Sequence, residues 1–360
     1  MEHSHSDRMG VAVVGCGYWG FNYLRILRDL PEVGKLVAID SRPNRLKEIT
    51  NRFQGIAAYE DVDGVLEDPA IDAVVICTPA STHDALVEQS LRAGKAVLVE
   101  KPIALDVERA EEVISLADDL DLTLAVGHTF LYNPAIDKIK SLIDTGQLGQ
   151  MYYLYARRTN LGPIREDVNA IWDLATHDIS IVHHLLGRLP QWVSAVGSNI
   201  LGSGRADVGF AVLGYEDDLV AHIHVSWADP SKVREVVVVG SERRVVFDDL
   251  KIGEQVRVYE KGVTPLASQD SESFGLDLLI RDGDIISPKI EVSEPLRNQV
   301  VDFLECIKTG DRPVSDGRAG LAVVKVLEAI DRSQKLRGAP VNVHVGEPAQ
   351  VSVDSSSDDR

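Results

Sequence analysis

The fold of this chain is decided near residue 15, where the sequence reads Gly10-Val11-Ala12-Val13-Val14-Gly15-Cys16-Gly17-Tyr18-Trp19-Gly20. The apolar run at 10–14 predicts a buried strand, and the pattern at 18–29 predicts a helix. Three glycines occupy the turn between them. In such a turn the first glycine permits the tight bend, the second admits a diphosphate, and the third allows close helix–strand packing. The stretch therefore predicts a dinucleotide site at the N-terminus of a helix.

An acidic residue at the end of the second predicted strand, 35–40, supports this interpretation. Asp40 lies twenty residues beyond Gly20. A carboxylate there accepts hydrogen bonds from ribose hydroxyls and repels a 2′-phosphate, so NAD is favoured over NADP. Arg42 could pair with such a phosphate, so NADP stays the alternative. A glycine turn that only packs tightly is the purely structural interpretation, and the combination of strand, spacing and acid disfavours it.

The first third of the chain alternates apolar runs with helical patterns. Further strands are predicted at 73–77, 96–99 and 123–126, and helices at 81–92 and 107–120. Continuous apolar strands are typical of a sheet that is covered on both faces. We therefore expect an α/β fold that begins with a Rossmann domain, a parallel sheet wrapped by helices, at residues 9–127.

From residue 128 the pattern changes to long alternating segments, which predict an antiparallel sheet with one packed and one more polar face. In 219–227 the apolar Ala221, Ile223 and Val225 share one face, and His222 and His224 share the other. Similar segments occur at 151–159, 192–199, 208–215, 234–239 and 243–247, and helices are predicted at 131–145, 172–186, 294–309 and 316–336. We expect an α+β domain with a large open, mainly antiparallel sheet at 128–347, and flexible tails at 1–8 and 348–360.

Composition excludes several classes of protein. The 360 residues contain 37 Lys and Arg against 56 Asp and Glu, a net charge of −19, which argues against non-specific nucleic-acid binding. The sequence has no apolar leader and no run of about 18 apolar residues, so no membrane partner is expected. Three cysteines lie far apart, as in a reducing compartment. We expect a cytoplasmic protein that acts on a small molecule.

Chemistry-bearing residues follow two of the predicted parallel strands. Thr78, Pro79 and His83 come after strand 73–77, and Glu100-Lys101-Pro102 comes after strand 96–99. Ligands of open α/β sheets bind at these carboxyl ends, so Lys101 is placed to hold a cation beside a nicotinamide. Far downstream, Asp173 and His177 are four residues apart, which puts both on one helix face.

These four motifs, in this order along nearly the whole chain, resemble the Gfo/Idh/MocA oxidoreductase family. The resemblance implies a Rossmann domain followed by an open-faced sheet domain, a cis peptide before Pro102, and a homodimer or homotetramer built on that sheet. Residues 157–173 are similar to a branch of the family that oxidises nucleotide-linked amino sugars, typically UDP-N-acetylglucosamine or its uronic acid, at C3.

The resulting hypothesis is hydride transfer from a sugar carbinol to NAD, with His177 as general base, Lys101 orienting the oxygen, and Asp173 holding Lys101 or the substrate. The expected cofactor contacts are Gly15, Gly17, Tyr18, Trp19, Gly20, Asp40, Ser41, Arg42, Thr78, Pro79, His83, Glu100 and Lys101. The expected substrate contacts are Arg157, Asn160, Arg165, Asn169 and Trp172. Because neighbours in a strand face opposite sides, at most one of Arg157 and Arg158 is expected to reach a ligand.

Purely structural interpretations stand beside these roles. His177 could be a satisfied core histidine, Lys101 a surface lysine, and Asp173 a carboxylate that stabilises its helix dipole. His83 and Asn133 could serve only as a helix cap and a turn residue. The histidines 183, 184, 222 and 224 lack the spacing of a metal site, so no metal is expected. Two other functions remain open: a dehydrogenase of free sugars or inositols, and a dinucleotide-binding sensor without catalysis.

Overall fold

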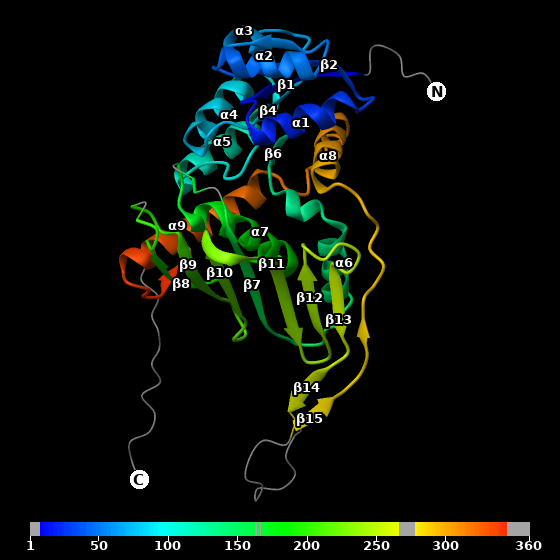
Figure 1. The fold of residues 1–360 in the computed structure, drawn as a ribbon, viewed down its shortest axis with the longest axis vertical. Helices are drawn as coiled ribbons and strands as arrows, with labels where there is room; N and C mark the ends of the chain where they lie inside the picture. Colours follow the sequence, from blue (N-terminus) through cyan, green and yellow to red (C-terminus); the bar gives the residue numbers. More distant parts are fainter. Residues whose placement is uncertain (1–7, 163, 166, 203, 266–277, 344–360) are drawn as a thin grey trace, which may run out of the picture.

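The computed structural model describes residues 8–162, 164–165, 167–202, 204–265 and 278–343. Most of the two predicted tails, and the last residues of the predicted second domain, lie outside these ranges. Two large sheets organise the described chain, one in the upper and one in the lower half of Figure 1.

The first sheet is parallel throughout and has the strand order β3-β2-β1-β4-β5-β6, the order of a Rossmann domain. This confirms the predicted fold class. Its strands are β1 (Met9–Val14), β2 (Val33–Ile39), β3 (Ala57–Tyr59), β4 (Ala73–Ile76), β5 (Ala96–Val99) and β6 (Leu124–Val126). The short edge strand β3 was not predicted, because three residues carry too little periodicity.

Helices cover both faces of this sheet, as its continuous apolar strands require. Val11 and Val13 of β1 pack toward one set of helices, and Ala12 and Val14 toward the other. The first set comprises α1 (Tyr18–Arg28), α2 (Pro43–Arg52) and α8 (Pro295–Thr309); the second comprises α3 (Asp63–Leu66), α4 (His83–Arg92) and α5 (Val107–Asp119).

Helix α8 returns from the far end of the sequence to the first domain. Figure 1 shows it in orange next to α1, and its Val300 and Phe303 are buried in the same apolar cluster as Leu24 and Leu27 of α1. The contiguous ranges 9–127 and 128–347 therefore remain a proposal, since one helix of the later range packs with the earlier one.

The second sheet has the order β16-β13-β12-β11-β7-β10-β9-β8-β17. Only β7 and β10 pair in parallel, and the other neighbours are antiparallel, so the sheet is mixed and mainly antiparallel as expected. The strands are β7 (Met151–Leu161), β8 (Trp192–Ser198), β9 (Val208–Gly214), β10 (Val220–Ser226), β11 (Ala228–Gly240), β12 (Arg244–Asp248), β13 (Val256–Tyr259), β16 (Ile285–Ile286) and β17 (Val341–Asn342); β14 (Gly262–Pro265) and β15 (Leu278–Arg281) form a separate hairpin.

One face of the second sheet is covered and the other is open. The helices α6 (Pro134–Asp144), α7 (Thr176–Leu186) and α9 (Gly317–Lys335) contact it. Along β10 the side chains of Ala221, Ile223 and Val225 are buried, whereas Val220 and His222 are exposed, which agrees with the predicted alternation. Within the described residues, no helix combines the length and apolar character that crossing a membrane needs.

Three short helical turns lie near the boundary between the domains. They are the 3-10 helices η2 (Ala80–Thr82) and η3 (Thr129–Tyr132) and the π-helical turn η4 (Ile171–Ala175). Because η4 runs directly into α7, the predicted helix at 172–186 exists but begins with a wider turn.

Candidate active site

The glycine turn between β1 and α1 has the three properties that its sequence predicts. Gly15 has φ of +86°, which favours glycine, and a Cβ on Gly20 would lie 2.0 Å from the carbonyl oxygen of Gly15. In contrast, a Cβ on Gly17 would meet no atom within 4 Å. Gly17 is also the N-cap of α1 and provides no side-chain cap, so the helix terminus is open to an anion. The turn fits the diphosphate of a dinucleotide.

Asp40 closes the edge of this site at the end of β2. Its carboxylate accepts a hydrogen bond from the backbone N–H of Cys16 at 2.8 Å and two from the guanidinium of Arg42, each at 2.8 Å. Burial acts against ionisation, but these hydrogen bonds outweigh it and lower the pKa of Asp40. Ser41 and Arg42 are exposed beside it. The end of β2 thus presents an ionised carboxylate next to the glycine turn.

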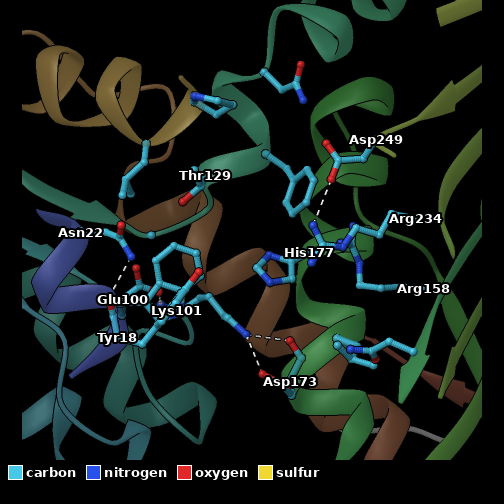
Figure 2. Close-up of a pocket in the computed structure, with 18 of the residues that line it drawn as sticks. Tyr18, Asn22, Glu100, Lys101, Thr129, Arg158, Asp173, His177, Arg234 and Asp249 are labelled. Carbon is cyan, nitrogen blue, oxygen red and sulfur yellow. Dashed lines mark hydrogen bonds and ion pairs between the residues drawn. The ribbon is translucent and has the colours of Figure 1, made fainter. Parts of the chain in front are cut away.

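A chamber of about 630 Å³ opens between the two domains, and Figure 2 shows its centre. Tyr18, Trp19 and Asn22 of α1 lie on one side, and residues of β7 and α7 on the other. The lining includes Glu100, Lys101, Phe130, Asn133, Arg158, Asn160, Arg165, Asp173, Leu174, His177, Trp227, Arg234, Asp249 and Glu294.

Lys101 is fixed at the floor of the chamber. Its Nζ donates to the backbone oxygen of Asp173 at 2.7 Å and to Oδ1 of the same residue at 3.0 Å, and the side chain is only 5% exposed (Figure 2). An ammonium has three donors, so one remains for an oxygen in the chamber. The Lys101–Pro102 peptide is cis, which confirms the expectation from the family resemblance.

The carboxylate of Asp173 accepts hydrogen bonds from three residues in different parts of the chain. Besides Lys101, it accepts hydrogen bonds from Nη1 of Arg165 at 3.1 Å and from Nε1 of Trp227 at 3.3 Å. Burial opposes ionisation, yet the charges of Lys101 and Arg165 outweigh it and lower the pKa of Asp173. An ionised Asp173 with both oxygens engaged is suited to hold Lys101 in place.

His177 faces Lys101 across the chamber (Figure 2). Its ring packs edge-on against Phe130, with ring centroids 5.2 Å apart, and its buried Nδ1 has no hydrogen-bond partner in the described part of the chain. Burial, followed by the charges of Lys101 and Arg158, holds the pKa of His177 well below its usual range. The imidazole is therefore neutral and can accept a proton.

Sequence reasoning missed the ion pairs behind His177. Arg158 is buried and makes three hydrogen bonds of 2.9–3.2 Å to Asp178, and its guanidinium lies 4.4 Å from the ring centroid of Phe130. Arg234 of β11 pairs with Asp249 at 3.1 Å. No local sequence pattern identifies Arg234 or Asp249, because the two side chains come close only through the pairing of β11 with β12.

Three of the predicted substrate contacts do not line the chamber. Arg157 is exposed on the open face of the sheet, because alternation along β7 sends Arg158 inward instead. Trp172 is buried, and its Nε1 donates to Asp331 at 2.9 Å. Asn169 accepts a hydrogen bond from the backbone N–H of Trp172 and so caps the following turn. Of the five predicted contacts, Asn160 and Arg165 do line the chamber.

The predicted cofactor contacts gather at the carboxyl ends of β1, β2, β4 and β5, and one of them, His83, is buried. Tyr18 and Trp19 are exposed at the chamber rim, and after β4 Thr78 is half-buried and Pro79 is exposed. His83, however, is buried, with its Nδ1 2.6 Å from the carbonyl of Pro102 and its Nε2 2.9 Å from that of Thr78. Both ring nitrogens lie within hydrogen-bond distance of a backbone carbonyl, and a neutral imidazole can donate to one of them, so His83 connects two loops.

Two other polar residues have mixed roles. Glu100 lines the chamber and accepts a hydrogen bond from the hydroxyl of Tyr23 at 3.0 Å; burial raises its pKa. Asn133 caps α6 through the N–H of Ala135 and also lines the chamber. No cluster of three or more His, Cys, Asp or Glu residues suited to a metal occurs in the ranges that the structure describes.

Comparison with known proteins identifies both domains. Residues 9–128 match the model of an oxidoreductase family with an NAD-binding Rossmann fold, and residues 136–246 match a GFO/IDH/MocA C-terminal domain. The chain is 29% identical to a UDP-N-acetylglucosamine 3-dehydrogenase of Acidithiobacillus ferrooxidans over 88% of its own length and 94% of that protein. It is 27% identical to an inositol 2-dehydrogenase of Rhizobium meliloti over 83% of its length and 89% of that protein.

A solved structure supports the same assignment. The crystal structure of GenD2 from gentamicin A biosynthesis, in complex with NAD, is 25% identical and covers 95% of this chain and 98% of its own, with a TM-score of 0.78. The likeness therefore extends over both domains and includes a structure that holds a dinucleotide.

Proposed function

Because the chain belongs to the Gfo/Idh/MocA oxidoreductase family, we propose that it is a dehydrogenase that oxidises a secondary alcohol of a sugar with NAD. One observation carries this proposal. The ammonium of Lys101 and the neutral imidazole of His177 line one chamber, next to a glycine turn that fits a dinucleotide. A proton acceptor and an oxygen-orienting cation are what hydride removal from a carbinol requires.

The cofactor would be held by residues of the first domain. The open turn at Gly17 would take the diphosphate, and the ionised Asp40 would accept hydrogen bonds from the adenosine ribose. Asp40 also supports NAD over NADP, because a 2′-phosphate would meet its negative charge. When bound, the nicotinamide supplies the hydride acceptor.

The chain's own residues would then divide the remaining chemistry. His177 takes the hydroxyl proton, a role that commonly contributes about 10²–10⁴-fold to rate. Lys101 donates its free N–H to the same oxygen and stabilises the negative charge that develops there. Asp173 keeps the Lys101 ammonium in place, and Trp227 and Arg165 keep Asp173 in place.

For the substrate we favour a nucleotide-linked N-acetylated sugar oxidised at C3. The UDP-N-acetylglucosamine 3-dehydrogenase relative supports this choice. So does the lining, since Asn160 lies in the chamber together with Arg165, whose guanidinium, although paired with Asp167 and Asp173, is a group that suits a diphosphate.

The second candidate is a dehydrogenase of a free sugar or inositol. The inositol 2-dehydrogenase relative supports it. The charges of the chamber support it as well. Arg158, Arg165 and Arg234 each pair with a carboxylate of the protein, so their positive charges are balanced without the diphosphate of a nucleotide sugar. A sensor without catalysis is disfavoured, because both Lys101 and His177 line the chamber.

Thermal unfolding with ligands tests the proposal. A ligand at one hundred times its Kd stabilises the fold by about 2.7 kcal/mol. NAD should raise the melting temperature more than NADP, and a UDP-N-acetylated sugar should raise it further and support NADH formation. A shift and NADH formation with inositol alone would favour the second candidate. Binding of NAD without NADH formation from any nucleotide sugar, sugar or inositol would contradict the proposal.

We also propose that the protein forms a homodimer or homotetramer through the open face of the second sheet. Several large apolar side chains are exposed there: Tyr153, Val196, Phe210 and Val220. Large apolar side chains exposed on one face of a sheet are typical of an interface between subunits.

A further inference from the structure

Two arginines that line the chamber stand opposite each other on neighbouring strands. Arg158 of β7 and Arg234 of β11 are directly paired in the antiparallel register. Like charges in this position destabilise a sheet. Each arginine has its own carboxylate, Asp178 for Arg158 and Asp249 for Arg234. The two ion pairs differ in how much of their hydrogen-bonding capacity they use.

The pair of Arg158 and Asp178 is closed to ligands, because its side chains are 5% and 1% exposed and three hydrogen bonds join them. In contrast, the side chain of Arg234 is 39% exposed. Within the described residues it donates one hydrogen bond, from Nη1 to Oδ2 of Asp249 at 3.1 Å. A guanidinium has five N–H donors, so Arg234 keeps free donors. Oδ1 of Asp249 accepts no hydrogen bond from the described part of the chain.

The backbone holds this open pair in place. Glu235 of β11 is paired with Asp248 of β12, and next to them the N–H of Asp249 donates to the carbonyl of Arg234 at 3.0 Å. Figure 2 shows Arg234 and Asp249 on the same side of the chamber as His177. Binding groups that are carried by paired strands keep their geometry. The free donors and the free acceptor are therefore in position before a substrate binds.

The charges of the pair indicate which ligand group it suits. A phosphate or carboxylate of a ligand would be repelled by Asp249, and an ammonium would be repelled by Arg234. A hydroxyl is neutral and both accepts and donates a hydrogen bond. Since Nη1 and Oδ2 are 3.1 Å apart, one hydroxyl oxygen can contact both side chains. Hydrogen bonds to charged groups are also the stronger ones. The pair thus fits a hydroxyl group of a sugar or an inositol.

Resting on the proposed function, we propose that Arg234 and Asp249 bind a substrate hydroxyl other than the one that is oxidised. The guanidinium donates to the oxygen of this hydroxyl, and its O–H donates to the carboxylate. The two residues thereby determine which carbinol of the substrate faces Lys101 and His177.

Such a second contact is needed because a sugar or an inositol carries several carbinols of similar chemistry. Lys101 and His177 hold only the oxygen that reacts, and the molecule would be free to turn about it. A hydroxyl bound at Arg234 and Asp249 removes this freedom, so hydride transfer occurs from one carbon of the substrate.

Substrate analogues and a double variant test the proposal together. The analogues are deoxy forms, each lacking one hydroxyl, of the sugar or inositol from which wild type forms NADH. In wild type, one analogue should lose at least about tenfold in kcat/KM, because hydrogen bonds to charged groups are lost. In Arg234→Met/Asp249→Leu the same analogue should lose less than about threefold relative to the full substrate, because the partners of its missing hydroxyl are absent.

The double variant removes both charges, so neither is left unpaired. Its melting temperature should stay close to that of wild type, because part-exposed ion pairs add little stability. The control is Arg243→Met/Glu260→Leu, which removes another part-exposed ion pair, 3.0 Å long, outside the chamber. This control should show the same loss with the deoxy analogue as wild type.

The outcomes separate this inference from the proposed function. A wild-type loss below about tenfold with every analogue, or a loss of about threefold or more in the folded double variant, overturns the inference alone. If the double variant does not fold, Asp249→Asn replaces it, because asparagine keeps the shape of the side chain. The loss should then fall by at least about threefold, and a smaller fall overturns the inference. Absence of NADH formation by wild type with every nucleotide sugar, sugar and inositol overturns the proposed function, and this inference with it.

Discussion

Single residues set the charge of the chamber. Lys101 is held by Asp173, while burial, followed by the charges of Lys101 and Arg158, lowers the pKa of His177 and keeps it uncharged. A cation and a neutral base can therefore face one another without a salt bridge between them. This pairing supports oxidation of an alcohol, since the base is already deprotonated when the substrate arrives.

The depressed pKa of His177 predicts the pH profile of the reaction. A base works only when deprotonated, and a pKa below the usual value of about 6.5 keeps it deprotonated to lower pH. The kcat/KM should therefore show no loss at pH 6.5 and should fall only below it. Measurement between pH 4.5 and 9 checks this, and a half-maximal point at or above about 6.5 would contradict it.

Asp40 should set the cofactor preference. In Asp40→Ser the negative charge is lost and Arg42 loses its partner, so a 2′-phosphate should become acceptable. The ratio of kcat/KM for NAD over NADP should fall at least about tenfold, which corresponds to about 1.4 kcal/mol. The exposed Glu60→Gln is the control and should keep the ratio. A ratio unchanged in Asp40→Ser would refute this role.

At the scale of elements, two substitutions in the turn between β1 and α1 distinguish an effect on folding from an effect on ligand binding. Gly17→Ala places its Cβ in open space, so the melting temperature without ligand should stay the same while stabilisation by NAD is lost. Gly20→Ala meets the carbonyl of Gly15 and should cost about 1–3 kcal/mol of unfolding free energy. Thermal unfolding with and without NAD measures both. Undiminished stabilisation of Gly17→Ala by NAD would show that the diphosphate does not lie there.

Local signals explain which parts of the fold could be predicted. The parallel strands, the glycine turn and the Glu100-Lys101-Pro102 motif follow from short apolar runs and the residues after them. Alternation along β7 also predicted that only one of Arg157 and Arg158 would face inward, but a strand's sequence does not say which of its faces a helix will cover. Packing in three dimensions decided it in favour of Arg158.

The positions of Trp172 and Asn169 outside the chamber have a related cause. Both belong to a segment that resembles substrate-binding regions of the family, yet one side chain packs on Asp331 of α9 and the other caps a turn. Their roles depend on partners distant in sequence or on backbone geometry. The same holds for Arg234 and Asp249, which no local pattern marks.

At the scale of the whole molecule, α8 links the two domains. It packs on α1 although it follows most strands of the second sheet in sequence, and Gln299 of α8 forms hydrogen bonds with both Tyr23 and Thr129 beside the chamber. Motion between the domains would have to break these buried hydrogen bonds. These hydrogen bonds therefore keep the relative position of Lys101 and His177 constant.

The open sheet face should control assembly. Phe210 is 42% exposed there and stacks on His224, so Phe210→Glu puts a charge into the proposed interface without disturbing the core. Light scattering after size-exclusion chromatography should find wild type as a dimer or tetramer and the variant as a smaller species. The exposed Leu336→Glu at the end of α9 is the control. A wild-type monomer would contradict the proposed interface.

The central claim is that Lys101 and His177 act on one oxygen, and the single-turnover rate of NADH formation at saturating NAD and sugar tests it most directly. His177→Gln and Lys101→Met should each slow this step by about 10²–10⁴-fold while still binding NAD. The double variant should be far less impaired than the product of the two effects, because the residues act as a unit. A His177→Gln enzyme that transfers hydride at the wild-type rate would contradict the account.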